Sequence, residues 1–176
     1  MSVEQPLKLD LTTAMARLLS DRELRAQFRN DAGQVAVTLG IDESARETFV
    51  GLNPAELEEQ AQGLIEKRKH EVARLLPLTW KTLSLRADPL FQEFAESFWP
   101  EGHRRHLLDA VRFGEYLGIH CERSLNTVEW NQRRFDLVGR SLSFHFVKDL
   151  IIEDQTRYAI QILIRWRGRI IQRFLF

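Results

Sequence analysis

The sequence predicts an α+β fold, mostly helical over its N-terminal two-thirds and followed by a three-stranded antiparallel meander at the C-terminus. Two observations carry this prediction. Up to about residue 137, apolar residues recur at steps of three and four, which is the helical period. After Gly139 they alternate with polar residues, which is the period of a strand. With 176 residues, 44% of them apolar, the chain is long enough to bury a stable core.

Capping signals mark where several of the expected helices begin. Two Ser-x-x-Glu spacings, starting at Ser20 and Ser44, have the pattern of a capping box. Asn53 followed by Pro54 predicts the start of a long helix that ends before Pro77. We expect about seven helices before the sheet.

Three segments after Gly139 read as strands. Residues 141–146 and 158–166 alternate apolar and polar side chains, so each predicts a half-buried strand. Arg167-Gly168 predicts a two-residue hairpin turn between the second strand and the third. This register places Ile164 opposite Ile171, and Ile162 opposite Arg173.

The domain organisation follows from these elements. We expect residues 1–10 to be a loose lead-in, residues 11–85 to form an N-terminal helical region, and residues 86–176 to combine helices with the sheet. The two larger regions can also share one continuous core.

The charge is balanced overall but not along the chain. The formal net charge is zero, with a balance of −4 over residues 1–100 and +4 over residues 101–176. Two halves of opposite sign can simply dock together, or the basic half can bind an anionic partner such as an acidic peptide. There is no signal sequence and no run of about 18 apolar residues, so we expect a cytoplasmic protein without a membrane segment.

Candidate chemical groups are few. The single cysteine, Cys121, excludes an intramolecular disulfide framework and a thiolate-rich zinc site. His103 and His106, with Asp109 one step further, have helical metal-ligand spacing, but capping and surface packing explain them as well. There is no glycine-rich phosphate loop, serine elbow or EF-hand pattern. We therefore expect no catalytic residue, metal or cofactor in this chain.

A helix-turn-helix DNA-binding regulator is an alternative, because short capped helices are expected within residues 11–51. Recognition helices normally carry several basic or amide side chains. Residues 33–50 hold one basic side chain, Arg46, among acidic neighbours, and these would repel a phosphate backbone. A generic protein-interaction module is the other reading that stays open.

A succession of short motifs resembles a known family. The motifs are LLSDRELRAQF at 18–28, LGI at 39–41, LNPAEL at 52–57, LIEKR at 64–68, LLP at 75–77 and WPEGHRRHLLDA at 99–110. This succession resembles a domain fused C-terminally to some actinobacterial multinuclear non-heme iron-dependent oxidases, and stand-alone partner proteins linked to those enzymes. The likeness covers roughly residues 11–120.

The resemblance implies a partner role. The oxidases of that family are TIM-barrel enzymes with an iron cluster bound by His, Asp and Glu, and they modify residues of ribosomally made precursor peptides. Their partner proteins hold the leader of the precursor and present its core to the iron. The resemblance therefore implies a heterodimer with an oxidase that holds the iron, and a precursor peptide as the second partner.

Two groups of residues are candidates for those contacts. Edge strands offer unpaired N–H and C=O groups to which a leader can add. The final hairpin carries four arginines that favour an acidic leader, at Arg165, Arg167, Arg169 and Arg173. Aromatic residues of the helix before Pro100 are candidates for the oxidase interface, with core packing as the alternative role, at Phe91, Phe94, Phe98 and Trp99.

Overall fold

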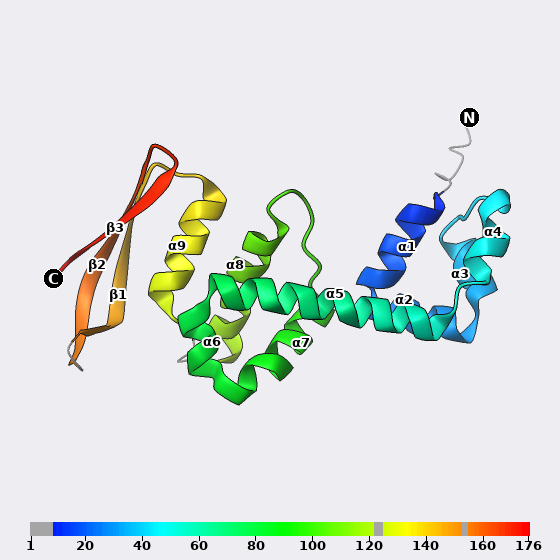
Figure 1. The fold of residues 1–176 in the computed structure, drawn as a ribbon, viewed down its shortest axis with the longest axis horizontal. Helices are drawn as coiled ribbons and strands as arrows, with labels where there is room; N and C mark the ends of the chain where they lie inside the picture. The colour runs from blue at the N-terminus through cyan, green and yellow to red at the C-terminus, as the bar shows by residue number, and fades with distance from the viewer. Residues whose placement is uncertain (1–8, 122–124, 153–154) are drawn as a thin grey trace, which may run out of the picture. The chain divides into compact units, whose positions relative to one another are not determined.

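The computed structural model describes residues 9–121, 125–152 and 155–176. In that part of the chain the helices come first and the sheet last (Figure 1), which confirms the α+β class and the C-terminal meander. The elements are α1 (Leu11–Ser20), α2 (Arg22–Asn30), α3 (Ala32–Thr38), α4 (Glu43–Val50), α5 (Pro54–Leu75), α6 (Pro77–Leu83), the 3-10 helix η1 (Ser84–Arg86), α7 (Ala87–Ser97), α8 (Arg105–His120), α9 (Thr127–Val138), β1 (Leu142–Ile152), β2 (Gln155–Trp166) and β3 (Arg169–Leu175).

The chain forms two compact units, residues 1–67 and 68–176, which meet inside α5. This division lies N-terminal to the boundary that we expected at residues 85 and 86. Residues 1–8 of the expected lead-in lie outside the described residues, which include its last two residues. Leu9 forms a parallel bridge with Ile41, and the Asp10 carboxylate accepts a hydrogen bond from the backbone N–H of Thr13 at 2.8 Å.

The N-terminal unit packs around an edge-to-face pair of rings. The ring centroids of Phe28 and Phe49 lie 5.2 Å apart with an interplanar angle of 85°, an arrangement that aromatic pairs favour. Other fully buried members of this core are Ala14, Leu18, Val35, Ala36, Ile41 and Leu57.

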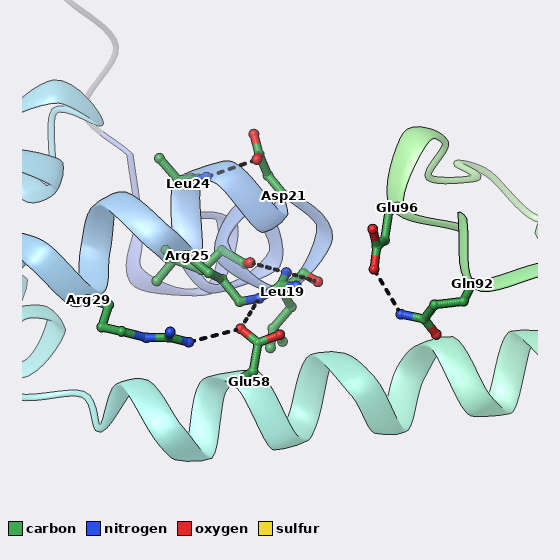
Figure 2. Close-up of polar contacts among 9 residues, drawn as sticks. Leu19, Asp21, Leu24, Arg25, Arg29, Glu58, Gln92 and Glu96 are labelled. Carbon is green, nitrogen blue, oxygen red and sulfur yellow. Dashed lines mark hydrogen bonds and ion pairs between the residues drawn. The ribbon is translucent and has the colours of Figure 1, made fainter. Parts of the chain in front are cut away.

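A buried arginine joins three helices of this unit. The Arg25 side chain is only 6% exposed and donates to the carbonyl oxygens of Leu18 and Leu19, each at 3.0 Å. Its Nε also donates to Glu58 Oε2 on α5 at 3.1 Å, and Arg29 approaches the same oxygen at 3.5 Å (Figure 2). Arg25 therefore satisfies carbonyls at the end of α1 that the helix itself leaves unpaired.

The helix caps in this unit differ from two of the predicted ones. Asp21, not Ser20, caps α2, accepting from the backbone N–H of Leu24 at 2.9 Å. Ser20 is still the last residue of α1, and its hydroxyl donates to a carbonyl of that helix. Ser44 lies inside α4, which has no side-chain cap hydrogen bond. The predicted cap at Asn53 is present, because its Oδ1 accepts from Ala55 N at 2.9 Å.

The C-terminal unit contains a short helix, α6, that the sequence did not indicate. Pro77 ends α5 as predicted but occupies the first turn of a new helix, where its missing N–H costs nothing. The Glu129 carboxylate accepts from the backbone N–H groups of Leu78 and Thr79, at 2.6 and 2.9 Å, and from the Thr79 hydroxyl at 3.0 Å. The cap of α6 is thus supplied by a residue of α9.

An ion pair is buried beside the aromatic core of this unit. Arg68 donates to both carboxylate oxygens of Asp109, at 2.8 and 3.0 Å, and to the carbonyl of Phe98 at 2.8 Å. The two side chains are 10% and 2% exposed. Burial raises the pKa of Asp109 above its ordinary value, although Arg68 opposes that shift.

Helices α8 and α9 touch at a glycine. An added Cβ at Gly114 would overlap Trp130 Cδ1, so the absence of a side chain is what lets the indole lie against α8. The Trp130 Nε1 donates to the carbonyl of Val111 on the same helix at 3.0 Å. Gly114 and Trp130 therefore fix how closely α8 and α9 pack.

The sheet has the strand order β1-β2-β3, and both of its pairs are antiparallel. Figure 1 shows α9 beside one face of it. The contact between α9 and the sheet is polar at its centre. Gln161 is fully buried, accepts from Asn131 Nδ2 on α9 at 3.0 Å, and donates to the carbonyl of Val128 at 3.1 Å and to Gln172 on β3 at 3.3 Å.

The strands alternate as predicted, but the apolar set faces outward. Leu142, Phe144 and Phe146 are 50%, 61% and 63% exposed. Ser143 and His145, between them, are half-buried on the face toward α9. β1 is therefore half-buried, as predicted, but its buried side is the polar one, because the amide pair of Asn131 and Gln161 commits that side of the sheet to α9.

A methyl group at Gly114 tests the contact between α8 and α9. We expect Gly114→Ala to lower the free energy of unfolding by about 1–3 kcal/mol, since overpacking forces the indole to move. Gly118→Ala on the same helix is the control. Nothing lies within 4 Å of its added Cβ, so this change should be neutral or stabilising. Equal urea unfolding midpoints for the two variants would contradict the close contact.

Removal of the guanidinium tests the buried ion pair. Arg68→Met leaves the Asp109 carboxylate without its cation and should cost about 3–5 kcal/mol in urea unfolding at neutral pH. Arg74→Met, which breaks an exposed pair with Glu71 on the same helix, should cost about 0.2–1 kcal/mol. The deficit of Arg68→Met should shrink as the pH falls, because protonated Asp109 needs no cation. A deficit that grows on acidification would contradict this account.

Candidate binding surface

The C-terminal hairpin has the register that the sequence predicts. Trp166 pairs with Arg169, Ile164 with Ile171, and Ile162 with Arg173. The two residues between the strands, Arg167 and Gly168, have φ values of 48° and 77°. Positive φ at both positions is the type I′ turn, whose twist matches that of the strands it joins.

One face of the sheet, here called the outer face, is apolar and exposed. Cross-strand neighbours share it, as shown by the parallel rings of Phe146 and Tyr158, whose centroids are 5.9 Å apart. Its most exposed members are Leu142 (50%), Phe144 (61%), Phe146 (63%), Tyr158 (68%), Ile160 (41%), Trp166 (63%) and Leu175 (57%). In register, Ile162, Ile164 and Ile171 fill the centre of the same face and are half-buried. Exposed apolar patches of this extent mark interaction sites.

The four hairpin arginines do not act as one group. Arg165 points to the face that meets α9, where its guanidinium lies 3.0 Å from Asp136 Oδ1 and 5.4 Å from the centroid of the Phe135 ring. Burial alone would raise the pKa of Asp136, but hydrogen bonds from Arg165 and Arg104 outweigh it and lower the pKa below its ordinary value. Arg165 is therefore occupied in holding the sheet to α9.

The other three arginines are exposed on the hairpin. Arg169 and Arg173 share the outer face with Trp166 and Ile162, and Arg167 sits in the turn with its guanidinium 6.0 Å from the centroid of the Trp166 ring. Within residues 9–121, 125–152 and 155–176, none of the three forms an ion pair with an acidic side chain. They give the β3 border of the outer face an unneutralised positive charge.

The aromatic residues proposed for an oxidase interface lie largely in the core. Phe91 and Phe94 are buried, at 0% and 3% exposure. Their ring centroids lie 5.2 and 5.4 Å from that of Phe113. Phe98 and Trp99 are half-buried, and Trp99 lies 4.8 Å from the Arg68 guanidinium carbon. Phe91 and Phe94 therefore offer no surface to a partner in this structure.

Asp109, the acidic residue of the metal-ligand spacing with His103 and His106, forms an ion pair with Arg68 in the fold. In the part of the chain that the structure describes, no group of three or more His, Cys, Asp or Glu side chains could hold a metal ion. Cys121 Sγ lies 3.1 Å from Arg86 Nη2.

The two helices within residues 33–50, α3 and α4, carry little positive charge. α3 contains no charged side chain after its cap, and the one basic residue of α4, Arg46, lies 3.5 Å from Glu43. A DNA-binding role for residues 11–51 stays a prediction, and α3 and α4 do not supply the basic side chains of a recognition helix.

The outer face is the feature that the sequence reading missed. The sequence contains a signal for it. Every second residue of β2 from Tyr158 to Trp166 is apolar, whereas the polar residue Gln161 lies on the opposite side of the strand. A buried amide needs a polar partner, and Asn131 of α9 is the residue that supplies one. A predicted pair between Asn131 and Gln161 would have indicated which side of the sheet faces α9.

The chain was compared with protein-family models, with curated proteins and with solved structures, and nothing matched. Across the described segments, no helix combines the length and the apolar character needed to cross a membrane.

Alanine substitutions separate the two kinds of hairpin arginine. Arg165→Ala should lower the free energy of unfolding by about 1 kcal/mol, through the lost ion pair and ring contact. Arg169→Ala should change it by less than about 0.5 kcal/mol. Because the pKa of Asp136 is lowered in the folded chain, its ion pair stabilises above the ordinary pKa of 3.8 and is lost below it. The deficit of Arg165→Ala should therefore shrink on acidification in urea titrations, and a constant deficit would contradict the assignment.

Proposed function

We propose that this chain is a non-catalytic binding subunit whose C-terminal hairpin holds an acidic precursor peptide for a multinuclear non-heme iron oxidase. The observation that carries the proposal is the exposed trio Arg167, Arg169 and Arg173, which has no acidic partner in the described residues. The resemblance of residues 11–120 to partner proteins of such oxidases supplies the identity of the two partners.

The β3 edge supports peptide binding by strand addition. β3 pairs with β2 on one side only, so its other side offers main-chain donors and acceptors to an extended segment. The arginines sit on the same strand and its turn, where they would meet acidic side chains of an added strand. Main-chain hydrogen bonds would then supply affinity, and charge would supply selectivity.

The half-buried Arg165 refines the set of peptide contacts. Its guanidinium is engaged by Asp136 and Phe135, so peptide binding would have to break a contact within the fold. We therefore assign the peptide contacts to the three exposed arginines and give Arg165 a supporting role.

In this proposal the oxidase, and not this chain, holds the iron and performs the oxidation. Co-expression of the chain with a multinuclear iron oxidase and its precursor tests this division of labour. We expect the three to purify together, with the iron retained by the oxidase when the subunits are separated. Tightly held iron on the isolated chain, or turnover of a peptide by it alone, would contradict the proposal.

A titration with a defined peptide tests the hairpin. The probe is a fluorescent synthetic peptide of alternating glutamate and valine, which combines strand propensity with negative charge. We expect the double variant Arg169→Glu and Arg173→Glu to weaken binding about tenfold at low salt, or about 1.4 kcal/mol, as measured by fluorescence anisotropy.

The matched control separates local contacts from overall charge. Arg17→Glu with Lys81→Glu makes the same change in net charge on exposed positions of α1 and α6 and should leave the affinity nearly unchanged. Equal weakening by both double variants, or no binding of the acidic peptide to the unaltered chain, would remove the hairpin from the proposal.

A further inference from the structure

The outer face presents a larger apolar surface than a lone subunit normally leaves open. Aromatic side chains offer about 150–250 Å² each, so its four aromatic residues together expose on the order of 500 Å². The aliphatic members, from Leu142 to Leu175, add to this. The largest apolar patch of a typical monomer is about 300–600 Å², and no other element among the described residues of 68–176 covers this one.

We propose that two copies of this chain stack through the outer faces of their sheets, giving a six-stranded sandwich with α9 of each copy on the outside. This inference goes beyond the proposed function and does not depend on it. Stacked sheets pack about 10 Å apart with interdigitated side chains. On each copy, the alternation of β1 and β2 puts a row of exposed apolar side chains on the outer face, and these can interdigitate.

The exposed area is of the size that a stable dimer requires. A standard interface buries about 800 Å² per partner. The four aromatic side chains account for more than half of that, and Leu142, Ile160 and Leu175, which are 41–57% exposed, bring the face to the same order. Aromatic residues are also the side chains that most often dominate interface energies.

The distribution of charge fits a second copy in one orientation. The outer-face positions from Leu142 to Phe146, from Tyr158 to Trp166 and from Arg169 to Leu175 carry no acidic residue, and their only charges are Arg169 and Arg173 on β3. An uncharged centre can meet its own copy without burying a charge.

The two arginines select between the possible two-fold axes. β2 is the middle strand, so an axis parallel to the strands passes over β2 and sets β3 of each copy against β1 of the other. Arg173 of each copy then lies over β1 of the other at the level of Phe144, because Arg173 and Phe144 both pair with Ile162, and cation–π contact is favourable there. An axis across the strands would set β3 against β3 and oppose like charges.

Sedimentation of the full chain tests the proposal. We expect a species of twice 20.6 kDa that dissociates on dilution. Phe144→Asp with Phe146→Asp should shift the chain to a monomer with an unchanged circular dichroism spectrum, since both side chains are already exposed. The control pair Leu85→Asp and Ile119→Asp, at positions 93% and 77% exposed outside the sheet, should leave the dimer intact.

A thiol crosslink tests the stacking over β2. In a Cys121→Ser background, Ile162→Cys places a thiol at the centre of β2, facing its own copy across about 10 Å. A disulfide needs Cα atoms within about 7 Å, so the probe is a short bis-maleimide, which should give a covalent dimer. Leu85→Cys is the control and should not.

Three outcomes would overturn the proposal: an unaltered chain that stays monomeric at high concentration, a dimer that survives Phe144→Asp with Phe146→Asp, or a crosslink that forms equally at Leu85. A monomer that binds an oxidase or a labelled single-stranded oligonucleotide through this face would assign the face to that partner instead. None of these results decides the peptide titration, which measures the affinity for the acidic peptide and not the oligomeric state.

Discussion

The hydrogen bond between the side chains of Asn131 and Gln161 decides which face of the C-terminal sheet meets the rest of its unit. Both amides are buried, and each would cost free energy if it were left without a partner. Gln161 also bonds to Val128 and Gln172, so it ties α9, β2 and β3 together. Once this side of the sheet is committed to α9, the alternation of the strands leaves the phenylalanines of β1 pointing outward.

The same alternation divides the hairpin arginines between two tasks. Arg165 lies on the side of Gln161 and reaches Asp136, where it adds to the attachment of α9. Arg169 and Arg173 lie on the other side and border an apolar surface. The proposed binding roles of the sheet, with an edge for a peptide and a face for another subunit, therefore depend on which side of the sheet is buried. The two proposed surfaces share Arg169 and Arg173, so a peptide at the β3 edge and a second copy on the outer face would compete for these side chains.

Local features of the fold could be predicted from the sequence, and contacts between distant residues could not. The turn at Arg167 and Gly168 and the register of its hairpin depend on neighbouring residues, and both were predicted. The helix at Pro77 was missed because its cap comes from Glu129, about fifty positions away. The burial of Phe91 and Phe94 depends on Phe113, and the orientation of the sheet depends on Asn131. Neither could be predicted from local periodicity.

The central claim is that the outer face is an interface, and hydroxyl-radical footprinting measures its exposure directly. The account predicts that Phe144, Phe146, Tyr158 and Trp166 are labelled strongly in dilute solution and are protected when the chain is concentrated. Leu85, which is exposed on η1, should be labelled equally at both concentrations. Labelling of the four aromatic residues that does not change with concentration would contradict the account.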